Sequence, residues 1–136
     1  MQAIVELSTT LVDNPNRGST FQILTTCSPR NFALVKSYGT DVVFDYNDPD
    51  CGWKIRKYTN DKLKFVEDCI TDEDISMPTC AAAVLSDGIG AKYYAFIDFE
   101  DCWPRDDVEL NYTMAYTCTG KELRFGDEDV PVRTGE

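Results

Sequence analysis

The clearest pattern of apolar and polar positions lies in residues 21–55. An apolar, β-prone run at 21–24 gives way to apolar residues at helical spacing over 32–38. Ser28 and Pro29 stand where a helix N-cap and first helical residue are expected, and Gly39 stands where a left-handed C-terminal cap is expected. A β-branched run follows at 42–44. The stretch therefore predicts strand, short helix and parallel strand, which is the βαβ unit of an α/β sheet.

The pattern continues in the same alternating manner toward the C-terminus. Asp48 is the expected N-cap of a second helix, which is followed by a strand at 64–70 and a helix at 72–85 that ends before Gly88 and Gly90. The run 92–99 is apolar on both faces and predicts a central strand, and 111–119 is a further strand candidate. We expect one domain over residues 1–126 and a flexible acidic tail over 127–136.

The first 26 residues break this alternation. Residues 3–7 and 9–12 are β-prone, 13–18 has the composition of a turn, and a strand follows at 21–26. A parallel crossover needs about a dozen residues or more, so the turn is too short for one. The first two strands must then be antiparallel neighbours or pair with different partners. Because a covering helix is missing on one sheet face, we expect a homodimer that forms through these two strands.

Composition narrows the classes of function. The net charge of −11 argues against nucleic acid and against anionic membranes as partners. No apolar run approaches the ~18 residues of a membrane span, and the N-terminus lacks a signal-peptide pattern, so we expect a cytoplasmic protein. The six cysteines form no CxxC pair and the chain has no histidine, which argues against a disulfide framework, a zinc site and imidazole catalysis.

Five short motifs carry a resemblance to a known family. They read TCSPRN at 26–31, FDYNDP at 44–49, DCI at 68–70, PRDDV at 104–108 and AYT at 115–117. In this order, between Gly18 and Gly126, they resemble the cofactor domain of the medium-chain dehydrogenase/reductases, and most of all the fungal trans-acting enoyl reductases that serve polyketide synthases. The resemblance implies a three-layer α/β fold, a truncated Rossmann-like domain with a mostly parallel sheet and an altered N-terminal strand pair.

The same resemblance implies cofactor-binding residues. Ser28 and Arg30 correspond to the turn at the 2′-phosphate of NADPH, and Tyr46 corresponds to a residue at the edge of the adenine. The alternative is that Ser28 only caps a helix, Arg30 is solvated and Tyr46 is a half-buried core aromatic. The glycine-rich turn that holds the pyrophosphate is reduced to residues 18–20, with no room for its helix before the strand at Phe21. We therefore expect no cofactor, with NADPH as the alternative.

Two acidic clusters follow predicted strands. Asp45, Asp48 and Asp50 could ligate Mg²⁺ or Ca²⁺, but a capped turn is the simpler explanation, so we expect no metal site. Residues 98–107 carry several carboxylates together with Trp103 and Arg105, and they read either as a ligand-binding loop or as a solvated acidic loop.

The leading hypothesis is a repurposed catalyst that binds a polyketide intermediate and directs its cyclisation, for example a Diels–Alder reaction, without redox chemistry. Its predicted catalytic residues are Arg105, Tyr46 and Trp103, in a pocket between the 46–50 turn and the 99–105 loop. The resemblance also implies an N-terminal domain that covers the nicotinamide, and we expect it to be missing. The alternatives are an NADPH-dependent trans-enoyl reductase fragment that needs a partner chain and a non-catalytic subunit that docks on a polyketide synthase.

Overall fold

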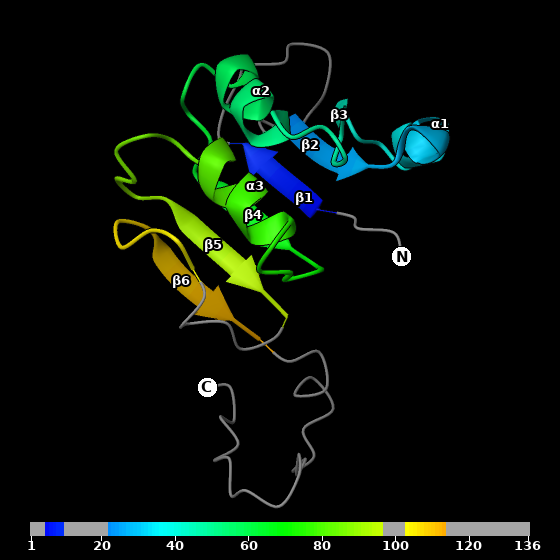
Figure 1. Ribbon diagram of the computed structural model, residues 1–136. Helices are drawn as coiled ribbons and strands as arrows, with labels where there is room; N and C mark the ends of the chain where they lie inside the picture. The colour runs from blue at the N-terminus through cyan, green and yellow to red at the C-terminus, as the bar shows by residue number, and fades with distance from the viewer. Residues whose placement is uncertain (1–4, 10–21, 97–102, 114–136) are drawn as a thin grey trace, which may run out of the picture.

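The computed structural model describes residues 5–9, 22–96 and 103–113. Its centre is a six-stranded sheet with the strand order β3-β2-β1-β4-β5-β6 (Figure 1). The strands are β1 (Val5–Thr9), β2 (Gln22–Cys27), β3 (Val42–Asp45), β4 (Phe65–Asp68), β5 (Lys92–Ala95) and β6 (Glu109–Tyr112). The helices are the 3-10 turn η1 (Pro29–Asn31), α1 (Phe32–Ser37), α2 (Cys51–Tyr58) and α3 (Ser76–Ala83).

Strand β1 is the exception in an otherwise parallel sheet. It pairs antiparallel with β2 on one side and with β4 on the other, so that Leu7 lies in register with both Leu24 and Val66. The pairs β2–β3, β4–β5 and β5–β6 are all parallel. The strand order is that of a dinucleotide-binding doubly wound sheet. The α/β class is confirmed, and of the two alternatives left open for the first two strands the structure shows antiparallel neighbours.

The location of β1 corrects one part of the sequence-based prediction. Both β1 and β2 are interior strands, and the outermost described strands are β3 and β6. A homodimer built by strand pairing through the first two strands is therefore wrong in its geometry, because their backbone groups are already paired within the sheet. Whether the chain dimerises through another surface stays a prediction.

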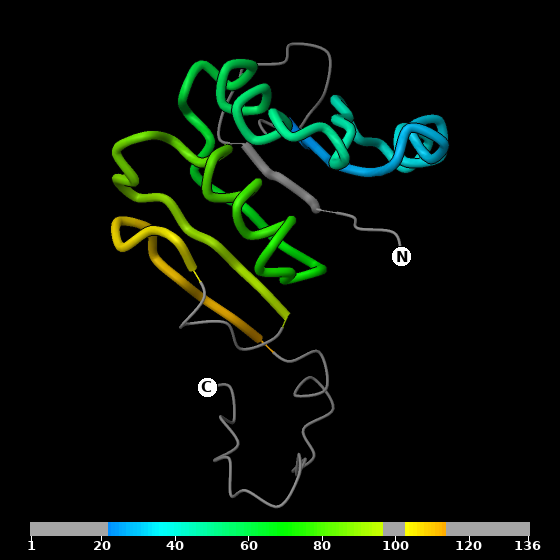
Figure 2. Tube along the Cα trace, viewed as in Figure 1, coloured from blue at the N-terminus to red at the C-terminus, as the bar shows by residue number. Residues whose placement is uncertain are grey.

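Helices α2 and α3 lie side by side and cover one face of the sheet (Figure 2). Their core residues Ile55 and Cys80 are fully buried together with Leu24, Val66 and Tyr93 of three strands. The shorter α1 packs at the β3 side of the sheet, and its buried Val35 lies outside this main cluster. The arrangement is the layered one that buries the apolar stripe of each helix against a sheet.

Local signals place most helix ends close to their predicted positions. Pro29 begins η1, and Gly39 has the positive φ of +103° that a left-handed helix cap requires. Helix α2 begins later than predicted because Asp48 forms a preceding turn, in which its carboxylate accepts the backbone N–H of Asp50 at 2.9 Å. Helix α3 also starts late, because the carboxylate of Asp72 accepts the N–H of Ile75 at 2.8 Å in a turn before it.

Several predicted segments fall outside the described residues. These are residues 10–12, residues 97–99 of the strand predicted at 92–99, residues 98–102 of the acidic loop, the strand beyond Thr113 and the tail at 127–136. None of the described helices is both long and apolar enough to cross a lipid bilayer.

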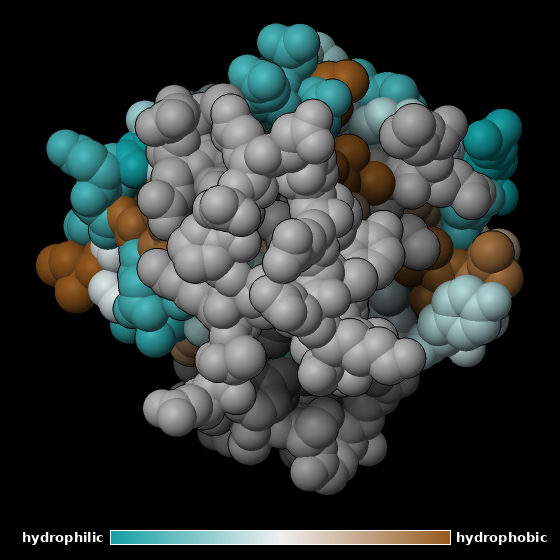
Figure 3. Space-filling view, turned by 90° about the horizontal axis from the view of Figure 1, so that it is seen from below, coloured by the Kyte–Doolittle hydropathy of each residue, from teal (hydrophilic) through white to brown (hydrophobic). Residues whose placement is uncertain are grey.

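The described surface is not uniformly polar. In Figure 3, apolar side chains reach the surface among hydrophilic ones at the sides of the view. The exposed large side chains are Leu34, Tyr38, Trp53, Tyr58, Ile75, Ile89 and Tyr94. Single exposed apolar residues are common, so only those that line a groove or a bare sheet face point to an interface.

Candidate functional site

The parallel strands β2 to β6 all end at the same end of the sheet, which we call its carboxyl end. Open α/β sheets bind ligands at this end, near the point where the strand order reverses. The first residues after these strands are Ser28, Tyr46, Cys69, Phe96 and Thr113. Two of the three predicted cofactor-binding residues, Ser28 and Tyr46, are therefore at the expected end.

The turn after β2 carries two polar side chains, Ser28 and Arg30, at the carboxyl end of the sheet. The Ser28 carbonyl accepts the N–H of Asn31 at 2.9 Å, but the Ser28 hydroxyl forms no cap hydrogen bond. Arg30 is exposed, and within the described part of the chain its guanidinium has no hydrogen bond or ion pair. A free hydroxyl and a free guanidinium two residues apart are suited to a phosphate, as the sequence predicts.

The turn after β3 is held by its own carboxylates. Asp45 accepts the backbone N–H of Asn47 at 3.0 Å and the Asn47 side-chain amide at 2.9 Å. Asp48 bonds to Asp50 N–H and forms an ion pair with Lys54, which together lower the pKa of the Asp48 carboxyl. Within residues 5–9, 22–96 and 103–113, no group of three acidic, cysteine or histidine side chains could hold a metal ion. The cluster is thus a self-capped turn beside the half-buried Tyr46.

The end of β4 holds a buried polar network that the sequence analysis missed. Asp68 is fully buried, and one of its carboxylate oxygens accepts the backbone N–H groups of Ile70 and Thr71, both at 2.9 Å. The other oxygen accepts the Tyr93 hydroxyl at 2.9 Å and faces the Cys80 thiol at 3.9 Å. The network fixes the loop that leaves β4 at the carboxyl end. The signals in the sequence are the position of Asp68 at the end of a predicted strand and its place in the DCI motif at 68–70.

The buried cysteines near this network, Cys51 and Cys80, are not activated nucleophiles. The four described cysteines, Cys27, Cys51, Cys69 and Cys80, form no disulfide with one another. Burial raises the pKa of the Cys51 thiol to about 11 and raises that of Cys80 well above its usual value. Burial, and to a smaller extent the negative charge of Asp68, raises the pKa of Tyr93. The Tyr93 hydroxyl therefore stays protonated and donates its hydrogen bond. Protonated thiols are poor nucleophiles, so these groups serve packing.

Trp103 lies in the core and not in an open pocket. It is 9% exposed, and its ring centroid lies 4.1 Å from that of Tyr93 at an interplanar angle of 36°. The tryptophan thus covers the tyrosine that donates to Asp68. The structure does not bring Trp103 to the surface beside Tyr46, and its predicted role as a substrate-holding aromatic stays a prediction.

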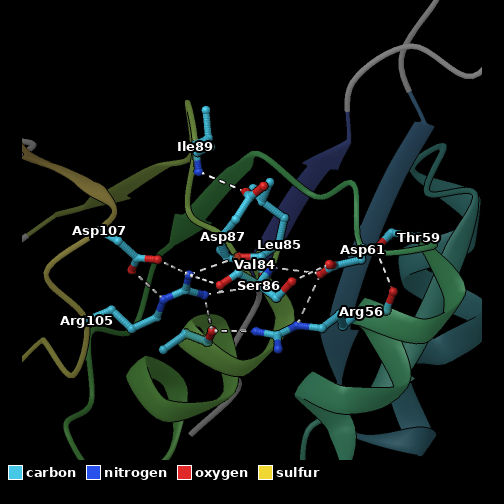
Figure 4. Close-up of polar contacts among 11 residues, drawn as sticks. Arg56, Thr59, Asp61, Val84, Leu85, Ser86, Asp87, Ile89, Arg105 and Asp107 are labelled. Carbon is cyan, nitrogen blue, oxygen red and sulfur yellow. Dashed lines mark hydrogen bonds and ion pairs between the residues drawn. The ribbon is translucent and has the colours of Figure 1, made fainter.

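Arg105 is at the opposite end of the sheet from Tyr46. Helix α3 runs from the carboxyl end of β4 back toward the start of β5, and Arg105 donates to carbonyls at and beyond the C-terminal end of α3 (Figure 4). The distances from the Arg105 guanidinium nitrogens to the carbonyl oxygens are 3.1 Å for Ala81, 3.4 Å for Val84, 2.9 Å for Leu85 and 3.3 Å for Ser86. The same guanidinium binds Asp107 through Nε at 2.8 Å and Nη2 at 2.7 Å. Arg105 and Tyr46 thus lie at opposite ends of the sheet, residues 99–102 of the predicted pocket lie outside the described residues, and the geometry supports a helix-capping role for Arg105.

A second arginine approaches the same helix end. Arg56 of α2 donates to the Ala81 carbonyl at 3.3 Å, so this oxygen receives two guanidinium groups (Figure 4). Asp61 lies 3.7 Å from Arg56 Nε and accepts the backbone N–H of Ser86 at 2.8 Å. Two cations at a helix C-terminus stabilise its unpaired carbonyls and its dipole. The network is a structural clamp between α2, α3 and the segment before β6.

We expect this clamp to weaken in acid. The hydrogen bond from Arg105 holds the pKa of Asp107 below its usual value, and the bonds from Ser86 do the same for Asp61. A carboxyl whose pKa is lower in the folded chain contributes stability that is complete above its unfolded pKa of about 4 and is lost as the pH falls through the folded value. The urea midpoint should therefore fall between about pH 5 and pH 2.5.

The matched control is Asp106→Asn, because Asp106 makes no hydrogen bond or ion pair within the described residues. Asp107→Asn removes the same charge and should flatten the acid-dependent fall of the urea midpoint, whereas Asp106→Asn should leave it unchanged. Equal curves for the two variants would contradict the role given to Asp107.

The described residues do not fit a complete dinucleotide. A pyrophosphate site needs a first strand that ends at the carboxyl end, followed by a tight turn and a helix N-terminus. Here β1 starts at the carboxyl end with Val5 and runs away from it, because it is antiparallel to β2 and β4. The next described element is β2 and not a helix. Ser28 and Arg30 can meet an adenosine phosphate, but among the described residues no cradle for the pyrophosphate exists beside β1.

Comparison with known proteins identifies relatives of one kind, although no family model matches the sequence. The dual trans-enoyl reductase/FAD-dependent monooxygenase tazHJ of Aspergillus terreus is 45% identical over 100 residues, which cover 74% of this chain and 14% of the relative. The trans-enoyl reductases fsa3 of a Fusarium species and eqxC of Fusarium heterosporum are 43% and 41% identical over 107 residues, 77% of this chain and 30% of each relative. The chain thus spans less than a third of the length of these relatives.

Proposed function

From the premise that this chain is a homologue of the fungal trans-enoyl reductases and resembles their cofactor domain, we propose that it binds a polyketide intermediate and directs its cyclisation without redox chemistry. The function belongs to polyketide biosynthesis, the setting in which the resembled enoyl reductases serve polyketide synthases. The substrate is mostly apolar, and a shaped cleft accelerates its cyclisation by holding the reacting carbons at short distance.

The observation that carries the proposal is the reversed β1. In a dinucleotide-binding sheet the corner between β2 and β4 is where the cofactor phosphates lie. The antiparallel strand takes the position from which the phosphate-binding turn and helix would start. Hydride transfer requires the nicotinamide and the enoyl carbon to be fixed at reacting distance, and the described residues, which form no such cradle, do not provide this alone.

The geometry changes which residues support a catalytic role. Tyr46 stays at the carboxyl end, with the free donors of Ser28 and Arg30 at the end of the neighbouring strand β2. These three residues are the polar anchors that we assign to the substrate. Arg105 and Trp103, also predicted to be catalytic, serve in our proposal to hold α3 and the Asp68 network in place.

Mass spectrometry of a linear polyketide incubated with the protein, with and without NADPH, distinguishes the alternatives. A cyclisation forms its carbon–carbon bonds at the expense of π bonds and leaves the mass unchanged. A reductase adds two hydrogens, one as hydride from NADPH and one as a proton, and oxidises the cofactor. An isomer formed without NADPH supports the proposal, a reduced product supports the reductase alternative, and unchanged substrate supports the docking subunit.

The reductase alternative assumes a partner chain that completes the site, so its test must contain such a chain. The described residues have the two polar side chains Ser28 and Arg30 but no pyrophosphate cradle, so any reductase activity should appear only when a second protein completes the site. Adding the matching polyketide synthase to the incubation covers this case, because a synthase is the proposed partner of both the reductase and the docking alternatives.

We also expect the protein to form a homodimer that covers the sheet face opposite α2 and α3. A shallow groove of about 250 Å³ on the sheet is lined by Phe65, Tyr94 and Phe96, among others. Among the described helices, α2 and α3 pack on the other side of β4 and β5. A second copy is the simplest cover for such a face. Light scattering at micromolar concentration should give twice the chain mass, and Tyr94→Glu should give a monomer, whereas a wild-type monomer would contradict the dimer.

A further inference from the structure

A second groove lies on the helical side of the molecule. It has a volume of about 470 Å³ and runs between the turn after β3, the N-terminal half of α2 and one side of α3. Its lining residues are Tyr46, Asn47, Asp48, Pro49, Gly52, Trp53, Asp74, Ile75, Pro78, Thr79 and Ala82. Apart from Tyr46, none of these residues belongs to the anchors assigned above.

The floor of the groove is a close contact of the two helices. Gly52 of α2 faces α3 so closely that an added Cβ would lie 2.5 Å from the Thr79 carbonyl oxygen and 2.7 Å from the Ala82 Cβ. A contact this tight leaves the helices little freedom to separate. The groove is therefore a preformed feature of the surface, and a partner that binds there meets little cost of rearrangement.

Two large apolar side chains stand on the rim. Trp53 is 60% exposed and Ile75 is 51% exposed, and they face the groove from α2 and from the turn before α3. The Trp53 ring is held by Arg56, whose guanidinium carbon lies 4.8 Å from the ring centroid. Arg56 is itself fixed by the Ala81 carbonyl. An oriented, exposed tryptophan beside a groove is typical of the residues that dominate protein–protein interfaces.

The charged side chains around the groove are mostly acidic, with the guanidinium of Arg56 over the Trp53 ring as a cation among them. Asp48 and Asp74 line it, and Asp50, Asp72 and Glu73 are exposed directly beside them in the sequence. The cation nearest in the sequence, Lys54, is already paired with Asp48. The whole chain carries a net charge of −11. Such a rim repels phosphates and other anions and attracts a cationic partner.

We propose that this groove docks a segment of a partner protein that carries a bulky apolar side chain flanked by lysines or arginines. The apolar side chain packs between Trp53 and Ile75, and a flanking cation meets the carboxylate of Asp74, which has no hydrogen bond or ion pair within the described residues. The acidic rim favours this occupant over a nucleotide, whose phosphates it would repel. The inference does not depend on which reaction the protein catalyses. Its test measures peptide binding alone, without a polyketide substrate, so it can fail or succeed independently of the proposed function.

Fluorescence anisotropy with labelled synthetic peptides tests the proposal. The probes are a leucine–lysine peptide, a serine–lysine peptide with the same charge and a leucine–glutamate peptide. The leucine–lysine peptide should bind several-fold more tightly than the serine–lysine peptide, and the leucine–glutamate peptide should not bind. Equal binding of the two lysine peptides would show attraction to net charge alone and would overturn the proposal.

Two pairs of matched variants locate the binding. Ile75→Ala and Asp74→Asn should each weaken the leucine–lysine peptide about fivefold. The controls Ile89→Ala and Asp87→Asn make the same chemical changes in the turn after α3, at the opposite end of that helix from the two tested residues, where Ile89 is 70% exposed. They should leave the affinity unchanged. Equal losses in test and control variants, or displacement of the peptide by adenosine diphosphate, would contradict a peptide-docking groove.

Discussion

Arg105→Ala is expected to lower the free energy of unfolding by about 2–4 kcal/mol. The side chain is only 16% exposed and donates to four carbonyls at and beyond the end of α3, as well as to both oxygens of Asp107. Removing the guanidinium leaves those carbonyls without their charged donor. It also leaves Asp107 without its partner. The residue sits before β6 in sequence, but its energetic role lies at the end of α3.

Urea denaturation of three variants measures this effect. Arg105→Lys keeps the charge but not the planar fork, so its stability should lie between those of the wild type and Arg105→Ala. Arg30→Ala is the control, because Arg30 is exposed and has no partner within the described residues. Its unfolding free energy should stay within about 0.5 kcal/mol of the wild type. If Arg105→Ala lowered the free energy of unfolding by less than about 0.5 kcal/mol, the capping role of Arg105 would be ruled out.

Asp68→Ala is expected to be at least as damaging, with a loss of about 3–5 kcal/mol. The fully buried carboxylate accepts two backbone N–H groups and the Tyr93 hydroxyl. Truncation removes the acceptor of two buried donors, the Thr71 N–H and the Tyr93 hydroxyl, and of the half-buried Ile70 N–H, and leaves a cavity beside Cys80. The loop that leaves β4 should loosen, and the carboxyl end of the sheet with it.

A double-mutant cycle separates the network from simple loss of volume. Asp68→Asn and Tyr93→Phe each break the 2.9 Å hydrogen bond, so the double variant should lose less stability than the sum of the two single losses. Near-ultraviolet circular dichroism of Trp103, which stacks on Tyr93, reports whether the core around them stays ordered. Strict additivity of the two losses would show that the Asp68–Tyr93 bond does not stabilise the fold.

Local sequence signals predict the elements that depend on neighbouring residues. Pro29 and Gly39 bound the first helical segment because fixed φ at the start and positive φ at the end are properties of single residues. Helix α2 begins later than the position of Asp48 predicts, because an aspartate can cap either a turn or a helix. Here Asp48 caps a turn that precedes the helix, and the helix begins at Cys51. Whether an aspartate caps a turn or a helix depends on several local hydrogen bonds of similar strength, and the sequence pattern alone does not predict which of them forms.

The insertion of β1 between β2 and β4 could not be predicted from local pattern. Antiparallel pairing with β2 follows from the short turn, but pairing with β4 joins residues some 60 positions apart in register, such as Leu7 with Val66. Alternation of apolar and polar residues predicts that a segment forms a strand, but it does not predict which other strands it pairs with. The homodimer expected through β1 and β2 failed for the same reason, because the second partner of β1 is within the chain.

The candidate site was predicted in part for a related reason. Ser28 and Tyr46 follow strands β2 and β3, and their location at the carboxyl end follows from the βαβ unit alone. Arg105 was assigned to the same end because it lies in the connection that follows β5. That connection returns to the start of β6, parallel to β5, and so carries Arg105 to the other end of the sheet. Tyr93 and Asp68 meet only because β4 and β5 are neighbours.

The central claim is that the reversed β1 replaces the corner at which a dinucleotide is held. Isothermal titration of the full chain with NADPH tests it most directly. We expect no saturable heat up to about 1 mM, since the charge-assisted hydrogen bonds of a pyrophosphate cradle are missing from the described structure. A dissociation constant near 1 μM, roughly −8 kcal/mol, that is weakened by Arg30→Ala would contradict the claim and establish a working cofactor site.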